Sequence, residues 1–475
     1  MFAGLDFGTS NCSMAIMQDG QPHLIPLEDG KTRLPSCLFI EKEVSDALTL
    51  PAGLIQQRLV AHKAQHGESA AAESDEVLVS KIRQQLRNEQ RDQRLNGKRS
   101  ENIVDALSHG GNVIFGAAAE HCHVHEAHNG FYIKSPKSFL GADISTAQKQ
   151  VFTSIVEKML AHIKQEAESI KQITLEQIVI GRPVNFHGLL GRDGNAQALA
   201  IIDSAARKVG YREVEFLMEP VAAAYDYERQ LSEDKLVLIL DLGGGTTDCS
   251  MIQIGPSFVH QQDRQQGILS HTGQRIGGID LDNKLAFMHL MPHFGKNVVL
   301  NNGLPVPNHL FKQAVNVNDV SAQQDFNSPR IGKELSRYLT MTGDPRLQRL
   351  LTLREGKLGL RVSRSAEQAK ILLSEQQQIE LALEYIEADF AVSLSRQQLS
   401  EAIADELSKF STLMHEAIKQ AGATPDALYV TGGTAMSPVI QHWIRSVFPE
   451  LEIVIGDHFG SVTAGLCTHA QRLFA

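Results

Sequence analysis

Residues 239–248 read "ILDLGGGTTD", a hydrophobic run that breaks into three glycines with an aspartate on either side. The apolar residues before the glycines predict a buried strand, and the alternation after them predicts a second one. We interpret the stretch as a β-hairpin with a glycine tip. Because glycine has no Cβ, the backbone N–H groups of Gly243, Gly244 and Gly245 can approach a bulky anion such as phosphate. An ordinary glycine-rich turn is the alternative interpretation.

The two flanking aspartates, Asp241 and Asp248, would repel a phosphate unless a hard cation lay between them, which indicates Mg²⁺ held mostly through water. Residues 4–11, "GLDFGTSN", repeat the same plan of strand, aspartate, glycine and hydroxyl residues. Two such hairpins predict a duplicated phosphate clamp. The further residues expected to form it are Asp6, Gly8, Thr9, Ser10 and Asn11 in the first hairpin, and Thr246 and Thr247 in the second.

A third glycine element occurs in "LYVTGGTAMSP", where a β-rich run ends in Gly432, Gly433 and Thr434 before an amphipathic helix. This pattern predicts a strand-to-helix turn whose helix N-terminus faces an anion. In "EFLMEPVAAAYDYE", Glu219 precedes an alanine-rich helix that we expect to begin near Val221. The small side chains of this helix would allow close packing between two lobes.

The composition limits the classes of protein that fit. The chain has 475 residues, 42% of them hydrophobic, and no apolar run near the roughly eighteen residues of a membrane span. We therefore expect a soluble protein of two or more domains with no membrane association. The N-terminus lacks the pattern of a secretion signal, and five cysteines without paired spacing fit a reducing compartment, so we expect the cytoplasm. A net charge of −10 argues against nucleic-acid binding.

These elements, in this order, resemble the actin-like ATPase fold of actin, sugar kinases and the DnaK-type seventy-kilodalton heat-shock chaperones. The chaperone ATPase domain is the most similar. "DFGTSN" resembles that family's DLGTTN, "MEPVAAAY" its NEPTAAA, "LDLGGGTTD" its DLGGGTFD, "RIGGIDLDN" with Gly278 its LGGEDFDN, and "YVTGGTAMSP" its VGGSTRIP. The resemblance implies an α/β protein of two lobes, each a ribonuclease-H-like core of a sheet flanked by helices, around a nucleotide cleft.

The stretch "AEQAKILLS" resembles the helix that holds the adenosine in these chaperones. Glu367, Lys370 and Ser374 keep the spacing of the family's E-x-x-K-x-x-x-S motif, and helical geometry puts them on one face. Two arginines of the family are Ile371 and Met436 here, so the stacking of the adenine must differ. The acidic residue of the last adenosine contact is also replaced, and Asp457 is the candidate to compensate for it.

The resemblance covers nearly the whole chain and divides it into lobes. Lobe one is expected over residues 1–232 and lobe two over 233–456, with 457–475 as a helix that packs back on lobe one. The polar residues 41–110 predict a helical insertion, and residues 290–360, with the adenosine helix at about 365–375, an enlarged lobe two. We expect no substrate-binding domain, which makes the chain similar to the YegD-type group of ATPase-only relatives.

The resemblance implies ATP or ADP with Mg²⁺, and allows K⁺ as a further ion. "KSFLG" keeps the spacing of the family's catalytic lysine, so Lys137 is expected to stabilise charge on the γ-phosphoryl group, with Lys134 as the alternative. The alternative interpretation is that both are surface lysines without a catalytic role. The expected catalytic residues are Lys137, Glu219, Asp241, Asp248, Asp6 and Thr246. Of these, Asp6 and Asp241 would hold Mg²⁺ through water, and Asp248 or Asp6 would orient the attacking water or accept its proton.

A cluster in "EHCHVHEAHNG" invites a metal-site interpretation. It consists of His121, Cys122, His123, His125 and His128, whose spacing matches no closed zinc motif. We therefore favour a cluster without a native metal ion.

Three classes of function fit the sequence. The leading hypothesis is a Mg²⁺-dependent ATPase whose lobes close on ATP as a switch for an unidentified protein partner or client, with a monomer favoured. A small-molecule kinase would replace the attacking water by a substrate hydroxyl. A filament or scaffold protein would bind nucleotide without turnover.

Overall fold

The computed structural model describes residues 1–42, 103–108, 112–126, 130–186, 191–259, 261, 264–317, 319–456 and 460–475. They divide into two compact units. The larger comprises Met1–Cys37, Phe115–Ala117 and Lys134–Ala475, and the smaller comprises Leu38–Ile114 and Ala118–Ile133. The expected insertion at 41–110 lies outside the described residues, apart from its first two residues and the short helix α3 (Ile103–Ser108). No described helix has both the length and the apolar character that crossing a membrane requires.

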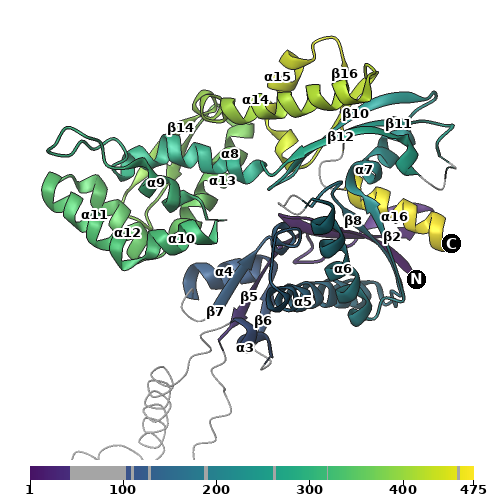
Figure 1. Cartoon of the computed structure of the whole chain (residues 1–475), viewed down its shortest axis with the longest axis horizontal. Helices are drawn as coiled ribbons and strands as arrows, with labels where there is room; N and C mark the ends of the chain where they lie inside the picture. Colours follow the sequence, from purple (N-terminus) through teal and green to yellow (C-terminus); the bar gives the residue numbers. More distant parts are fainter. Residues whose placement is uncertain are drawn as a thin grey trace, which may run out of the picture. The chain divides into compact units, whose positions relative to one another are not determined.

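The first sheet of the larger unit is built around the N-terminal strand β1 (Phe2–Phe7). It has the order β3-β2-β1-β8-β9, and β4 (Leu34–Pro35) pairs with β2. The other strands are β2 (Asn11–Gln18), β3 (Gln21–Leu24), β8 (Gln177–Arg182) and β9 (Glu213–Met218). β1 and β2 form the predicted antiparallel hairpin, whereas β8 and β9 continue the sheet in parallel. Helices α5 (Thr146–Lys171) and α6 (Arg192–Val209) pack against each other beside it (Figure 1).

The second sheet of the larger unit repeats this plan. β10 (Lys235–Leu242) and β11 (Thr247–Ile254) form the antiparallel hairpin around the three glycines, with Asp241 opposite Asp248. The sheet order is β12-β11-β10-β15-β16, with β12 (Ile268–Gln274), β15 (Ala427–Thr431) and β16 (Glu452–Ile455). Helix α14 (Arg396–Ala421) lies across β11 and β12 (Figure 1). The duplication predicted from the two glycine hairpins is therefore present in the strand pairing.

Two helices join the sheets into one core. α7 (Glu219–Glu228) connects β9 to β10 and begins two residues before the expected Val221. α16 (Ser461–Phe474) packs against α7, β1 and β8. A Cβ added to Gly465 of α16 would collide with the carbonyl group of Ala222, so the two helices touch backbone to backbone. The alanines of α7 therefore serve a contact with α16.

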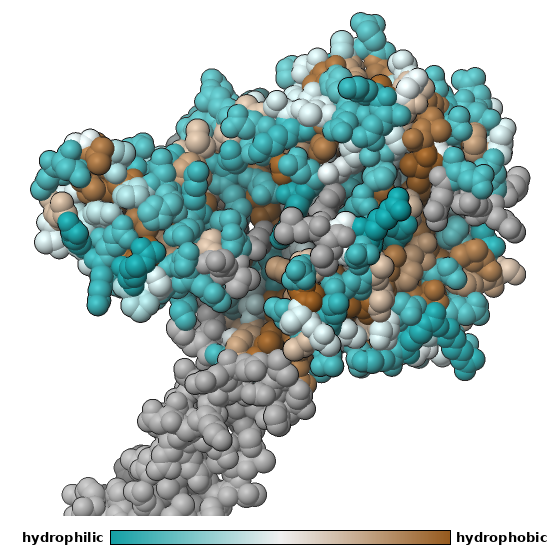
Figure 2. All heavy atoms as spheres, viewed as in Figure 1, coloured by the Kyte–Doolittle hydropathy of each residue, from teal (hydrophilic) through white to brown (hydrophobic). Residues whose placement is uncertain are grey.

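Residues 290–360 form helices that extend the second half of the unit. They are η4 (Met291–Phe294), α9 (Asn308–Val315), α10 (Val320–Asn327), α11 (Pro329–Thr342) and α12 (Pro345–Glu355), followed by α13 (Gly359–Glu375). Their buried side chains, such as Phe311 and Leu335, belong to the same hydrophobic cluster as Leu238 and Leu240 of β10. In Figure 2 these helices present a largely hydrophilic surface, which fits a helical extension with its apolar side turned inward.

The remaining elements of the larger unit are short. They are η1 (Pro136–Phe139), η2 (Arg264–Gly267), α8 (Gly278–Leu285), η3 (Ala286–Leu290), β13 (Gln378–Ala382), β14 (Ala391–Ser395), η5 (Gly433–Met436) and α15 (Pro438–Val447). η5 and α15 follow β15 directly, as predicted for the strand-to-helix turn of the third glycine element.

The smaller unit contains a three-stranded sheet and the helix that bears the histidine cluster. The sheet order is β6-β5-β7, with β5 (Cys37–Glu41), β6 (Val113–Phe115) and β7 (Gly130–Lys134). His121, Cys122 and His123 lie on α4 (Gly116–Glu126), where the His123 ring stacks on Tyr132. Within the described ranges no group of metal-ligating side chains forms, but His128 and the His125 side chain lie outside them.

An ion pair between Arg264 and Glu228 is buried where α7 ends. The Arg264 Nη2–Glu228 Oε1 distance is 2.7 Å, and the exposed fractions of the two side chains are 2% and 1%. Replacing Arg264 with methionine leaves the Glu228 carboxylate buried and unpaired. We expect the free energy of unfolding to fall by about 3 to 5 kcal/mol in urea denaturation. The control Arg207→Met breaks the exposed pair with Asp203 and should change stability little. Equal effects of both variants would show that burial adds nothing to the cost of breaking the Arg264–Glu228 pair.

Candidate functional site

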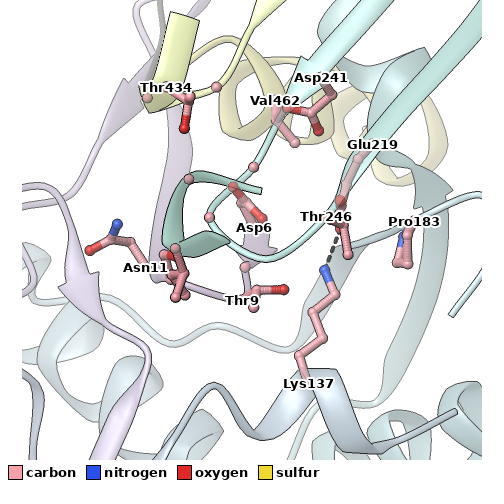
Figure 3. Close-up of a pocket in the computed structure, with 18 of the residues that line it drawn as sticks. Asp6, Thr9, Asn11, Lys137, Pro183, Glu219, Asp241, Thr246, Thr434 and Val462 are labelled. Atoms are coloured by element: carbon pink, nitrogen blue, oxygen red, sulfur yellow. Dashed lines mark hydrogen bonds and ion pairs between the residues drawn. The ribbon is translucent and has the colours of Figure 1, made fainter. Parts of the chain in front are cut away.

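A cleft of about 300 Å³ lies between the two glycine hairpins of the larger unit (Figure 3). A Cβ added to Gly244 would collide with the Ser10 hydroxyl, and one added to Gly245 would lie 3.0 Å from Thr9 Cγ2. The two hairpin tips therefore meet at a separation that only glycine permits. At Gly244 the missing Cβ makes room for Ser10, whereas the sequence pattern indicated only that the glycines admit an anion.

The second glycine loop is hydrogen-bonded to the first residues of α8. The N–H groups of Gly278 and Ile279 donate to the carbonyl oxygens of Gly243 and Gly244, at 3.0 and 2.8 Å. A Cβ on Gly277 would lie 2.6 Å from the Gly244 carbonyl carbon, so this position also requires glycine. Because its carbonyls are engaged in this way, the loop has a fixed shape.

The third glycine loop closes the cleft from the side of β15. Gly432 has a φ of 90°, and a Cβ there would collide with the backbone of Leu242. Gly432, Gly433 and Thr434 all line the cleft. All three glycine elements found in the sequence therefore converge on one cavity.

Of the two lysines considered for catalysis, Lys137 is the one that lines this cavity. It lies in η1, is buried, and forms an ion pair with Glu219 at the start of α7 (Figure 3). Ser135 has left-handed backbone angles, with φ 55° and ψ 52°, and so turns the chain ahead of Lys137. Lys134, the alternative, ends β7 and does not line the cleft.

Three carboxylates line the cleft together with Lys137: those of Asp6, Glu219 and Asp241. Burial, with the charge of Glu219 adding to it, raises the pKa of Asp6 to about 7. Burial also raises the pKa of Asp241 well above its usual range, with Glu219 and Asp248 contributing. Burial lowers the pKa of Lys137, but Glu219 and Asp6 outweigh this effect and the pKa is raised.

The charge balance of this site suits a hard cation. Lys137 is paired with Glu219, and among the described residues neither Asp6 nor Asp241 has an ion-pair partner. Both aspartates line the cleft, and their raised pKa values reflect first the cost of burying a carboxylate and then the nearby charge of Glu219. Carboxylate oxygens are the ligands that Mg²⁺ prefers, directly or through water. The two aspartates therefore fit the expected cation.

The helix expected to hold the adenosine contributes two of its three predicted residues. Glu367, Lys370 and also Ile371 line the cleft. The Ser374 hydroxyl does not line it, because it donates to the Lys370 carbonyl within α13 at 3.2 Å. Lys370 Nζ lies 2.8 Å from Asp282 Oδ1 and donates to the Gly278 carbonyl at 3.1 Å.

Asp282 was not among the predicted residues, although it lies within the quoted "RIGGIDLDN". Burial raises its pKa to about 6, against the lowering effect of Lys370. The sequence could have indicated Asp282, because it is a second acidic residue one helical turn beyond Gly278. Met436 lies in η5 and is 46% exposed, but it does not line the cleft.

Several other predicted residues lie outside the cleft lining. The Thr247 hydroxyl is buried and donates to the Ile276 carbonyl at 2.7 Å, so it stabilises the fold. Asp248 is buried beside β12 and is not part of the lining. Asp457 lies outside the described residues. The predicted residues that do line the cleft are Asp6, Gly8, Thr9, Ser10, Asn11, Lys137, Glu219, Asp241, Gly243, Gly244, Thr246, Gly278, Glu367, Lys370, Gly432, Gly433 and Thr434.

The cleft also contains residues that no motif had indicated. Pro183, Asn185 and Phe186 follow β8, and Arg33 and Arg275 come from the loops before β4 and after β12. The carboxyl end of a parallel strand such as β8 is a common place for ligand contacts in α/β proteins. This general preference could have pointed to the segment after β8 from the sequence alone.

The raised pKa of Asp6 predicts how stability changes with pH when divalent cations are removed. The folded state holds a proton on Asp6 up to about pH 7, whereas the unfolded state releases it near pH 4. Because the folded state binds more protons in this window, the free energy of unfolding should fall as the pH rises through it. Asp6→Asn cannot ionise, so in EDTA it should stabilise the protein more at pH 8 than at pH 5.

Urea denaturation at both pH values measures this difference, and Asp29→Asn in an exposed turn is the control. A stabilisation by Asp6→Asn that is the same at both pH values would contradict the raised pKa.

Two protein-family models match parts of the chain. The model of the MreB/Mbl protein matches residues 151–284, which include the second glycine hairpin and α7. The model of the Hsp70 protein matches residues 348–453, which include α13 and the third glycine loop. Together with two sheets of the same plan around one cleft, these matches confirm the α/β, actin-like ATPase fold expected from the sequence.

Proposed function

We propose that this protein, which has the actin-like ATPase fold and is related to the Hsp70 and MreB/Mbl families, is a Mg²⁺-dependent ATPase that acts as a conformational switch. The observation that carries the proposal is the buried Lys137, paired with Glu219 and facing Asp6 and Asp241 between two glycine loops. The finer part of the proposal is a chaperone-related role as a DnaK-type, YegD-like ATPase with a protein partner.

The phosphates would bind between the two hairpin tips. The loops at Gly8–Thr9 and at Gly243–Gly244 line the cleft from opposite sheets, so backbone N–H groups can approach a polyphosphate from both sides. The Thr9 and Thr246 hydroxyls lie in the same cavity and add donors. A nucleotide held in this way would contact both lobes at once.

Asp6 and Asp241 would hold the Mg²⁺ ion, mostly through water, and K⁺ is a further candidate ion. When bound, the cation would neutralise charge on the phosphate oxygens. Because the cation would balance the charges of Asp6 and Asp241, Lys137 could act on the γ-phosphoryl group. The ion pair with Glu219 would keep the Lys137 ammonium group in position. The lysine contributes charge stabilisation and forms no bond.

Hydrolysis needs a water molecule that attacks the γ-phosphorus while the bond to the β–γ bridging oxygen breaks. The proton of that water must pass to a base, and Asp6 lines the cleft whereas Asp248 does not. This difference favours Asp6 over Asp248, two residues that the sequence could not rank.

At the other end of the cleft, Glu367 and Lys370 would contact the ribose or the edge of the base. Lys370 is already oriented by Asp282 and by the Gly278 carbonyl. Because Gly278 also donates to the glycine loop at Gly243, the base and phosphate ends share one rigid support.

A thermal-shift panel tests nucleotide binding. ATP or ADP with Mg²⁺ should raise the melting temperature, because ligand at a hundred times its Kd stabilises the native state by about 2.7 kcal/mol. EDTA should remove most of the shift if Asp6 and Asp241 act through the cation. GTP and inorganic phosphate complete the panel, and limited proteolysis should give different patterns with ATP and ADP. The absence of any shift with nucleotide would overturn the proposal.

Replacing Lys137 tests the catalytic assignment. Lys137→Met keeps the aliphatic length but removes the charge, so hydrolysis of ATP should fall at least a hundredfold, whereas ADP affinity should change little. Release of labelled inorganic phosphate by the purified protein measures the rate, and ADP binding confirms that the variant is folded. Lys134→Met is the matched control, because Lys134 does not line the cleft. If only Lys134→Met lost hydrolysis, Lys134 would be the catalytic lysine and Lys137 would not.

A further inference from the structure

A hydrogen bond joins the two halves of the larger unit beside the cleft. Asn185 follows β8 of the first sheet and lines the cleft, and His271 lies in β12 of the second sheet. The Asn185 Nδ2–His271 Nε2 distance is 2.9 Å. Neither residue belongs to the phosphate, cation or lysine sites described above.

The orientation of each amide in this contact is fixed by a backbone group. The Phe186 N–H donates to Asn195 Oδ1 at 2.6 Å, and a backbone N–H can only donate. The Asn195 amide must therefore direct Nδ2 toward Asn185 Oδ1, which accepts at 2.8 Å. Asn185 then has only its Nδ2 group to offer to His271, so the histidine must accept through Nε2. This requires the neutral ring with its proton on Nδ1.

His271 faces the first lobe because its neighbours face the other way. The hydroxyls of Ser270 and Thr272 donate to carbonyl groups of α14, at 2.5 and 2.7 Å, so this face of β12 packs on α14. Side chains alternate along a strand, which directs His271 to the opposite face. On that face, the partner strand β11 carries Ser250 opposite His271.

We propose that the chain Asn195–Asn185–His271 is a clasp that holds the two lobes together beside the cleft and must open before nucleotide can leave. The proposal rests on nucleotide binding in this cleft. Asn195 orients Asn185 from the first lobe, and His271 is the single acceptor that the clasp uses on the second. Loss of this acceptor should leave the fold intact, because the contact is only partly buried.

The experiment measures the release of a fluorescent ADP analogue, chased with unlabelled ADP, in wild type and three variants. His271→Leu removes the acceptor, so release should be about 2- to 10-fold faster, the range expected for one hydrogen bond. His271→Gln carries an amide oxygen that can accept from Asn185 Nδ2 near the position of Nε2, so it should restore a rate close to wild type. His309→Leu, at an exposed histidine of α9, is the control and should have no effect.

A second measurement uses the protein without nucleotide. Hydrogen exchange at residues 184–186 should be faster in His271→Leu than in wild type and His271→Gln, because Phe186 N–H depends on the same chain of hydrogen bonds. Unchanged release and unchanged exchange in His271→Leu would overturn the clasp, as would equal behaviour of the leucine and glutamine variants. If wild type binds no nucleotide, the proposed function fails, and the exchange experiment still decides whether the contact exists.

Discussion

The charge balance inside the cleft is the constraint on which the site depends. Asp6, Glu219 and Asp241 come from three different elements, and the Lys137 ammonium group compensates only one of them. Burial is the main cause of the raised pKa values of the two remaining carboxylates, and the charge of Glu219 adds to it. The arrangement becomes favourable once a cation and a polyphosphate share the cavity, which connects the electrostatics to the proposed function.

The shape of the cleft wall depends on glycines at positions where a Cβ would collide with a neighbouring segment. Gly244 allows Ser10 to approach, Gly277 allows the segment before α8 to lie against the second loop, and Gly432 allows the third loop to pass Leu242. Each contact occupies space that a side chain would need. At Gly277 and Gly432 the neighbour is backbone, whereas at Gly244 it is the Ser10 hydroxyl.

The sequence predicted those parts of the site that local patterns encode. Strands around the glycines, the strand-to-helix turn and the placement of Lys137 follow from short motifs whose geometry is set within a few residues. Thr247 and Ser374 lie outside the cleft lining, and their hydroxyls donate to carbonyl partners that no spacing reveals. Asn185 and Asp282 were missed because their roles arise from contacts with residues 86 and 88 positions away, His271 and Lys370. Such pairs are fixed by the tertiary fold.

The two lobes are joined by contacts of very different strength, and this difference decides how they can move. Around α7 and α16, residues of both sheets share one hydrophobic cluster, and the guanidinium groups of Arg264 and Arg472 both lie over the Tyr225 ring. Breaking the buried Glu228–Arg264 pair would leave charges unpaired in the interior, whereas the Asn185–His271 bond is partly buried and can be exchanged for water. Motion between the lobes should therefore pivot about α7 and α16 and open at the clasp. A nucleotide that contacts both hairpin tips would resist that opening, so its binding energy and the lobe position are coupled.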